Sequence, residues 1–188
     1  MKTDSHLKTL LIDIDGVACD HASAICSWVS DEYMINAKYE DVTSWNHNFG
    51  PITFIEAVEK YYPRKDFILN MEVTSGFLDF LKSMGKRMNI KFATSRQYSH
   101  NETCRWIREK FGDYETFFIG SKVYIFFDYL IDDRHEECIR AAREGRIAFL
   151  MSRPWNDNEQ TKHKVKAFQN IHFIKSFDEV EAYFNGYE

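Results

Sequence analysis

The stretch that decides the fold lies near the start of the chain and reads Leu10-Leu11-Ile12-Asp13-Ile14-Asp15-Gly16-Val17. Its short aliphatic run predicts a strand over residues 8–14, of the parallel kind that is buried on both faces. Asp13 and Asp15 follow at the carboxyl end, where open α/β sheets have their ligand sites. Because a buried carboxylate needs a compensating partner, the pair favours a functional site. The alternative is that the acids only begin a turn, for which Gly16 supplies the backbone freedom.

The same pattern occurs again later, where Leu130-Ile131 is followed by Asp132 and Asp133. Adjacent like charges repel, so this second pair requires a cation or a strong hydrogen-bond donor nearby. One metal ion can compensate the charge of both acid pairs if the two strands are neighbours and their ends meet around it. Carboxylates, carbonyls and water suit a hard cation such as Mg²⁺.

Two further segments carry groups that can bind phosphate. An apolar run over residues 90–93 ends in the hydroxyls of Thr94 and Ser95. Hydroxyls and free amides at a strand-to-helix turn are good phosphate donors, although the same residues can simply cap the turn. Lys122 stands between two apolar stretches. A single lysine is ordinarily a solvated surface residue, but a site with several aspartates and a phosphate requires a fixed positive charge.

Four motifs therefore follow one another along the chain, namely Asp13-Ile14-Asp15-Gly16-Val17, Thr94, Lys122 and Asp132-Asp133. In this order and spacing the chain resembles the haloacid dehalogenase superfamily of phosphotransferases over nearly its whole length. It resembles more narrowly the 5'(3')-deoxyribonucleotidases, in which a small helical cap follows the first motif. The later segment 152–156, Ser-Arg-Pro-Trp-Asn, is similar to a Pro-aromatic-Asn segment of bacterial members. Arg96 departs from the Ser-Pro step of the animal enzymes.

This resemblance implies a two-step phosphoryl transfer. Asp13 would attack phosphorus and form an aspartyl-phosphate, and Asp15 would serve as general acid and then as general base. Mg²⁺ would bind Asp13, the backbone carbonyl of Asp15 and Asp132, with Asp133 supporting it directly or through water. The residues expected to contact the phosphate are Gly16, Thr94, Ser95 and Lys122.

Substrate choice is expected to come from the segment 20–71, which has no strong strand signal and is read as a helical cap. A core domain of residues 1–19 and 72–188 would surround this insertion. Six aromatic residues of this segment are candidates to stack on a nucleobase, namely Trp28, Trp45, Phe49, Phe54, Tyr61 and Tyr62. Trp45 and Phe49 are the best placed of them, because residues 44–51 read as a loop. The alternative is that these rings belong to the core of the cap, as aromatic residues usually do.

Strand and helix patterns alternate along the chain, which predicts an α/β fold. We expect a Rossmann-like three-layer core with a central parallel sheet and the small helical cap inserted after the first strand. A capping-box spacing at residues 99–102 predicts the start of a helix over 101–111. Strands are expected at 8–14, 90–93, 116–119, 130–131, 147–151 and 171–174, and helices at 21–33, 53–61, 76–85, 134–144 and from 176 onward.

Composition limits the classes of partner. The 188 residues carry a formal net charge of -5, which argues against a binding surface for nucleic acid polymers. No stretch approaches the length of a membrane span and no leader pattern is visible, so a cytoplasmic protein without a membrane partner is expected. The four cysteines lack C-x-x-C spacing and are expected to be reduced, and the histidines are expected at solvated positions. A homodimer is an expectation from the family resemblance.

The leading hypothesis is a Mg²⁺-dependent phosphomonoesterase that acts on nucleoside monophosphates. An alternative is a phosphatase of the same superfamily for another small metabolite, such as a sugar phosphate. A third hypothesis is a nucleotide-binding regulator without turnover. It is less favoured, because a pure binder does not need an acid beside a nucleophile.

Overall fold

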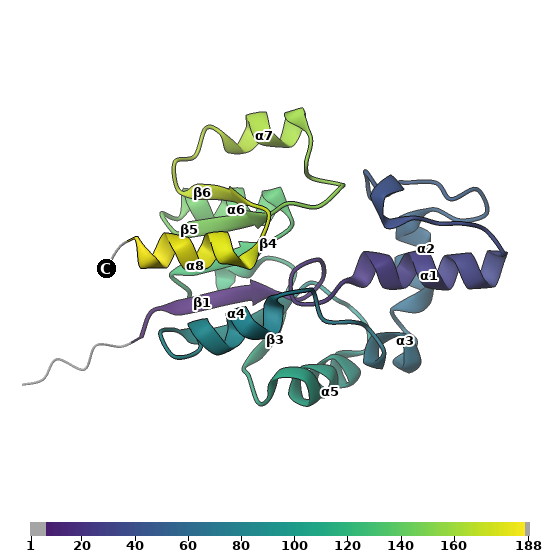
Figure 1. Ribbon diagram of the computed structural model, residues 1–188, viewed down its shortest axis with the longest axis horizontal. Helices are drawn as coiled ribbons and strands as arrows, with labels where there is room; N and C mark the ends of the chain where they lie inside the picture. Colours follow the sequence, from purple (N-terminus) through teal and green to yellow (C-terminus); the bar gives the residue numbers. More distant parts are fainter. Residues whose placement is uncertain (1–6, 187–188) are drawn as a thin grey trace, which may run out of the picture.

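A central sheet of six parallel strands organises the molecule, whose computed structural model describes residues 7–186. The strands are β1 (Thr9–Asp13), β2 (Asn89–Thr94), β3 (Thr116–Phe118), β4 (Tyr129–Asp132), β5 (Ile147–Met151) and β6 (Ile171–Ile174). Their order is β3-β2-β1-β4-β5-β6, so β1 lies in the middle between β2 and β4 (Figure 1). The expected pairing of the first strand with the Leu130-Ile131 strand is thereby confirmed.

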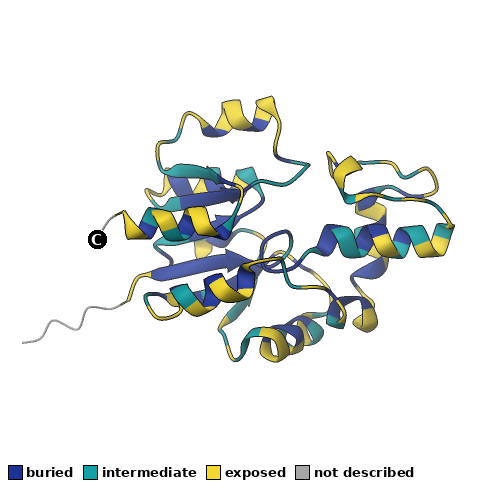
Figure 2. Cartoon of the chain, in the orientation of Figure 1, coloured by how far each residue is buried: buried dark blue, intermediate teal, exposed yellow. Residues whose placement is uncertain are grey.

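Alternating side chains of the strands fill two separate apolar layers. Leu10 and Ile12 point into the larger layer, whereas Leu11 points into the smaller one. The larger layer is covered by α4 (Phe77–Met84), α5 (His100–Phe111) and α8 (Phe177–Asn185), and the smaller by α6 (His135–Arg143) and α7 (Glu159–Val165). Figure 2 shows the strands as the buried centre between these helices. The predicted three-layer α/β core is confirmed.

Four helical segments between β1 and α4 lie beyond the carboxyl end of β1 (Figure 1). They are α1 (His21–Tyr33), the 3-10 turn η1 (Tyr39–Asp41), α2 (Phe54–Tyr61) and α3 (Lys65–Leu69). A complete capping box between Thr53 and Glu56 begins α2. We refer to residues 20–71 as the cap. The core expected at 1–19 and 72–188 extends at both ends beyond the described residues.

The capping box predicted at the start of α5 is wrong. Ser99 adopts the left-handed region with φ 54, and its side chain caps no amide of the helix. Its hydroxyl donates instead to the carbonyl of Tyr62, at 2.7 Å, and so ties the cap to the core. The helices α3 and α7 and the 3-10 turn η2 (Lys122–Tyr124) were not predicted.

The expectation of solvated histidines is wrong for His21, which is only 1 % exposed. This residue begins α1, where the chain passes from β1 into the cap. The four cysteines are free thiols, and three of them are buried. No helix within residues 7–186 has the length and apolar character needed to cross a membrane.

Candidate active site

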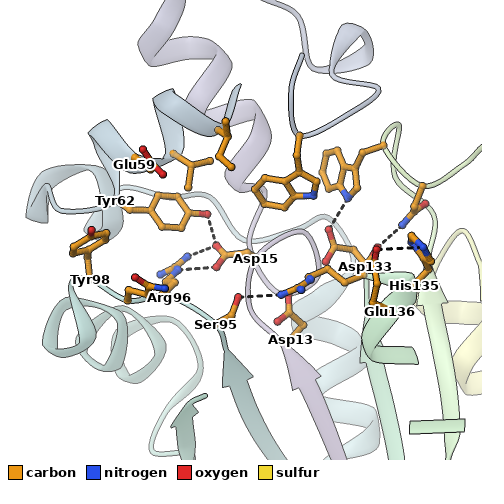
Figure 3. Close-up of a pocket in the computed structure, with 17 residues that line it drawn as sticks. Asp13, Asp15, Glu59, Tyr62, Ser95, Arg96, Tyr98, Asp133, His135 and Glu136 are labelled. Atoms are coloured by element: carbon orange, nitrogen blue, oxygen red, sulfur yellow. Dashed lines mark hydrogen bonds and ion pairs between the residues drawn. The ribbon is translucent and has the colours of Figure 1, made fainter. Parts of the chain in front are cut away.

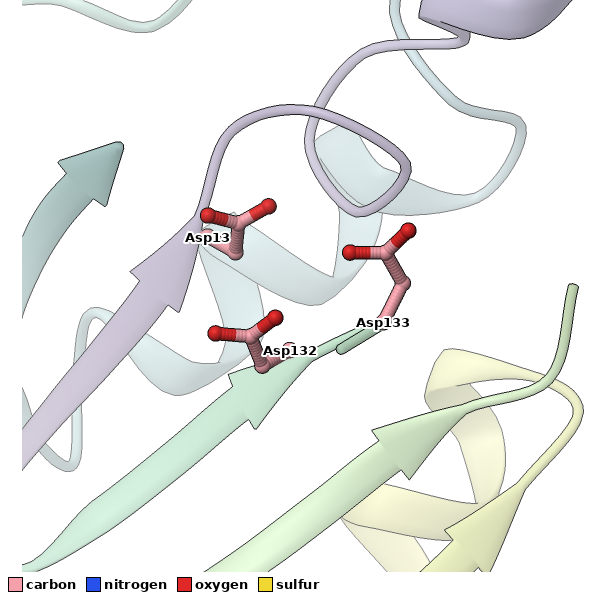
Figure 4. Close-up of side chains that lie close together, drawn as sticks. All are labelled: Asp13, Asp132 and Asp133. Carbon is pink, nitrogen blue, oxygen red and sulfur yellow. The ribbon is translucent and has the colours of Figure 1, made fainter. Parts of the chain in front are cut away.

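Three carboxylates converge at the carboxyl edge of the sheet. Asp13 ends β1, Asp132 ends the neighbouring β4, and Asp133 follows directly (Figure 4). One oxygen of each lies within 4.8 Å of the others, and all three side chains are buried. The parallel pairing of β1 with β4 is what brings residues so distant in sequence together.

Lys122 is buried beneath these carboxylates. Its Nζ lies 2.6 Å from Asp13 Oδ1 and 2.7 Å from Asp132 Oδ2, and its side chain is 2 % exposed. The backbone amide of Lys122 donates to the buried carboxylate of Glu137 at 2.8 Å, which anchors η2 to α6. Burial alone would lower the pKa of Lys122, but Asp13 and Asp132 raise it well above its usual range, so the ammonium stays charged.

Burial and mutual repulsion destabilise the ionised forms of Asp13 and Asp133. Burial raises the pKa of Asp13 well above its ordinary value, and Asp132 and Asp133 add to this shift against the opposing charge of Lys122. Burial and Asp132 also raise the pKa of Asp133, to about 7. One lysine therefore does not compensate three buried carboxylates, which is the situation that a bound cation relieves.

Asp15 is held by residues from both the core and the cap. Arg96 donates to its two oxygens, from Nη2 at 2.6 Å and from Nε at 2.8 Å. The hydroxyl of Tyr62 donates to Asp15 Oδ1 at 2.8 Å (Figure 3). Burial acts to raise the pKa of Asp15, but the Arg96 guanidinium outweighs it and holds that pKa well below its usual range. Asp15 is thus a carboxylate in this arrangement.

A cavity of about 510 Å³ opens between the sheet edge and the cap. Asp13, Asp15 and Asp133 form part of its wall, and Trp45, Val58 and Tyr62 of the cap form another part (Figure 3). The rest of the wall comes from α2 of the cap, from the loop after β2, from the segment that leads from β4 into α6 and from the loop after β5. These other lining residues are Ile55, Glu59, Ser95, Arg96, Gln97, Tyr98, Arg134, His135, Glu136, Trp155 and Asn156.

The expected phosphate-binding residues are close to the carboxylates. Gly16 has φ +76, and a Cβ there would lie 2.6 Å from Asp133 Oδ2, so a side chain at this position would be strained and would displace the Asp133 carboxylate. Ser95 lines the cavity, while the buried Thr94 donates to Asp15 Oδ2 at 3.3 Å. Lys122 lies below the cavity wall, in contact with Asp13.

The two aromatic candidates of the cap differ in position. Trp45 lines the cavity and is 36 % exposed. Phe49 does not contribute to the cavity wall and packs instead against His47 and Phe54. Trp45 is therefore the better placed of the two to contact a ligand.

Sequence reasoning missed two residues that contact the candidate catalytic groups. Tyr62 was expected only as one of the rings that could stack on a base, and not as a donor to Asp15. Arg96 had been noted only as a departure from the Ser-Pro step. A signal existed for Arg96, because a charged residue directly after two phosphate-binding candidates needs a partner if it is buried.

The site fits a magnesium ion by the chemistry of its donors. Its candidate ligands are oxygens only, which is the donor set that Mg²⁺ prefers. Within residues 7–186, the buried Asp132 Oδ2 receives no well-directed hydrogen bond. Asp13, Asp132 and Asp133 are thus the residues that would hold the ion.

Known structures share this fold at low sequence identity. A haloacid dehalogenase-like hydrolase from Streptococcus pneumoniae aligns with TM-score 0.63 and 13% identity, over 95% of this chain and 98% of the other. A hydrolase of the same type from Bacillus subtilis, solved with bound magnesium, aligns with TM-score 0.61 and 14% identity, over 96% and 100%. One from Deinococcus radiodurans, solved with phosphate and sodium, has TM-score 0.63 and 11% identity, over 96% of each chain.

A search of curated proteins finds no match. A family model, described as 5' nucleotidase, deoxy (pyrimidine), cytosolic type C protein, matches residues 7–177. That span contains both acid pairs, the buried lysine and the cap. The chain shares its fold with these haloacid dehalogenase-like hydrolases. It therefore belongs to this nucleotidase family, and it is a phosphoric monoester hydrolase.

Proposed function

We propose that the protein is a Mg²⁺-dependent phosphatase of nucleoside monophosphates that works through an aspartyl-phosphate on Asp13. The observation that carries this proposal is that Asp13 of the core and Trp45 of the cap line the same cavity. A phosphate near Asp13 would leave the rest of its ester facing the cap. An aromatic ring in that position favours a base over an aliphatic sugar.

In the first step, a carboxylate oxygen of Asp13 attacks phosphorus and the bond to the ester oxygen breaks. The ammonium of Lys122, 2.6 Å from Asp13 Oδ1, keeps this carboxylate in position and offsets charge on the transferring group. Ser95 and the amides of the loop after β2 are suited to bind phosphoryl oxygens. Bound Mg²⁺ would neutralise phosphoryl charge and orient the group for in-line attack.

Asp15 handles the proton in both steps of this proposal. The approach of an anionic phosphate raises the pKa of Asp15, which lets it carry a proton to the leaving ester oxygen. Once the alcohol has left, the ionised Asp15 accepts a proton from the water that attacks the phosphorus of the aspartyl-phosphate. The bond between phosphorus and Asp13 then breaks, which releases inorganic phosphate and regenerates the Asp13 carboxylate. Arg96 and Tyr62 keep the carboxylate beside the cavity throughout.

The test is phosphate release from a panel of deoxyribonucleoside monophosphates, a hexose phosphate and a small aryl phosphate, with Mg²⁺ or with chelator. We expect nucleotides to be the best substrates, and activity to be lost in chelator and in Asp13→Asn. Full activity in chelator, or near-normal activity of Asp13→Asn, would contradict the mechanism. A preference for the hexose phosphate would overturn the nucleotide assignment alone.

We also propose a cytoplasmic location, which the cytosolic description of the matching family supports. The homodimer suggested by the family resemblance stays a prediction, which light scattering of the purified chain would test.

A further inference from the structure

One loop after β5 holds both the side chain and the backbone of Asp133. The indole Nε1 of Trp155 donates to Asp133 Oδ2 at 2.8 Å. The next residue, Asn156, donates from Nδ2 to the carbonyl of Asp133 at 2.6 Å and to that of Met151 at 2.8 Å. The loop therefore fixes the orientation of a carboxylate that the proposed metal site uses.

The ring of Trp155 faces the cap. It lies 5.5 Å from the ring of His21 in α1, 6.1 Å from Tyr39 in η1 and 6.4 Å from Phe54 in α2, measured between centroids. His21 in turn stacks on Trp45, at 6.1 Å and an interplanar angle of 23°. A continuous line of rings thus runs from the cavity wall of the cap to the donor that holds Asp133.

The contacts at the two ends of this line of rings are of different types. The bond from Trp155 to Asp133 is directional, so a rotation of the indole changes the position of the carboxylate. The contacts on the cap side are ring packing, which tolerates small shifts. His21 is also held by ring packing rather than by directional bonds, because among the described residues neither of its ring nitrogens has a hydrogen-bond partner.

We propose that Trp155 is a positioning residue that couples the cap to the metal site. Its Nε1–H orients Asp133 for Mg²⁺, while its ring is one of the surfaces on which the cap packs. Metal binding and ordering of the cap then favour each other, since a coupling between two sites is reciprocal. This inference rests on the Mg²⁺ site of the proposed function.

The first experiment separates the two roles by calorimetric titration with Mg²⁺ alone. Trp155→Phe keeps a ring against the cap but loses the donor, and we expect it to bind Mg²⁺ about 10- to 100-fold more weakly than wild type. Phe54→Leu is the matched comparison, because it removes a ring from the cap side and leaves the bond to Asp133. It should lower the melting temperature and weaken Mg²⁺ binding less than Trp155→Phe does, since it acts on the metal site only through the packing of the cap on Trp155.

A second experiment needs no variant and covers the case in which Trp155→Phe does not fold. Hydrogen exchange of the wild-type chain, measured with and without Mg²⁺, should show slower exchange of cap amides in α1 and α2 with the metal. If Trp155→Phe folds, it should lose this protection of the cap.

The outcomes distinguish the inference from the function on which it rests. Equal Mg²⁺ affinity of wild type and Trp155→Phe, or metal protection confined to the sheet edge, would overturn the coupling and leave the phosphatase proposal standing. Absence of Mg²⁺ binding to the wild-type chain would overturn both.

Discussion

At the scale of single residues, the site is governed by charge balance. Lys122 is the cation nearest to Asp13 and Asp132, and Arg96 neutralises Asp15 separately. The two cations thus form ion pairs with different carboxylates. Among the described residues neither forms an ion pair with Asp133, which accepts from Trp155 instead, although the charge of Lys122 still acts to lower the pKa of Asp133. This division explains why the site still accommodates a divalent ion although two basic side chains are buried in it.

Replacing Lys122 with methionine should lower kcat by about 100- to 1000-fold, because one preorganised charge contact contributes about 3 kcal/mol or more to transition-state binding. The variant should also be less stable, since removing one partner of a buried ion pair costs about 3–5 kcal/mol. Steady-state kinetics and urea unfolding without Mg²⁺ check both effects. Wild-type kinetics in the variant would remove Lys122 from the site.

His21 predicts a pH dependence of stability. Burial lowers its pKa to about 4, whereas the unfolded chain has the ordinary value of about 6.5. Between these values the unfolded state binds more protons, so the free energy of unfolding falls as the pH drops from about 6.5 to 4. This one group accounts for about 3 kcal/mol of that loss.

The matched variant for this prediction is His21→Phe, which keeps a ring among Phe54 and Trp155 and removes the titrating group. The difference in unfolding free energy between wild type and variant, measured from pH 7 to pH 4, isolates the histidine from other groups. The difference should change in favour of the variant as the pH falls. Parallel stability curves would mean that His21 titrates with the same pKa in the folded and the unfolded chain, which would contradict the prediction.

At the scale of elements, the turn between β1 and α1 packs directly against Asp133 and against the loop after β5. Gly16 has φ +76, and Arg153 donates from Nε to its carbonyl at 2.6 Å. The missing Cβ leaves room for Asp133 Oδ2 and for the ring of Trp155. The turn thus requires glycine both for its backbone conformation and for the close approach of these side chains.

Gly16→Ala should therefore lose both stability and Mg²⁺ affinity. Its Cβ would lie 2.6 Å from Asp133 Oδ2, which must move away from the metal site. Gly145→Ala is the control, because Gly145 has a similar φ of +75 with nothing within 4 Å of its Cβ position. Both variants should lose about 1–2 kcal/mol of stability from left-handed strain. Calorimetry should find weakened Mg²⁺ binding in Gly16→Ala only, and equal binding in both would contradict the steric argument.

At the scale of the whole molecule, chemistry and substrate choice belong to different parts that share one cavity. The sheet edge supplies Asp13, and the cap supplies Trp45. A phosphate site alone cannot distinguish esters of similar charge, so discrimination depends on how the cap lies over the core. Tyr62 and Ser99 support that arrangement through the hydroxyls that they extend across the boundary.

Trp45→Ala should lower kcat/KM for nucleotides more than for a small aryl phosphate. Stacking of a base on an aromatic ring contributes about 1–3 kcal/mol, which corresponds to roughly 5- to 150-fold. Phe49→Leu is the control, because Phe49 lies outside the cavity wall, and it should leave the ratio of the two efficiencies unchanged. An unchanged ratio in Trp45→Ala would assign Trp45 to the packing of the cap.

The sequence by itself determined the layered core and the meeting of the two acid pairs. The reason is local: hydrophobic runs with regular spacing fix the strands, and parallel strands end at one edge of the sheet. A short run such as Leu130-Ile131 therefore sufficed to bring Asp132 beside Asp13. The start of a helix could be predicted equally well where the two interacting residues lie within one helical turn of each other, as in the capping box of Thr53 and Glu56.

Only the tertiary structure decided which side chains surround the motif residues. Arg96 and Tyr62 reach Asp15 across 81 and 47 positions of sequence, and no periodicity encodes such pairs. Ser99 failed to cap its own helix for the same reason, because docking of the cap offered its hydroxyl the carbonyl of Tyr62. The contacts of Tyr62 and Ser99 depend on how the cap folds back over the sheet edge, and that of Arg96 depends on the pairing of β1 with β2. Such packing is a property of the whole chain rather than of any segment.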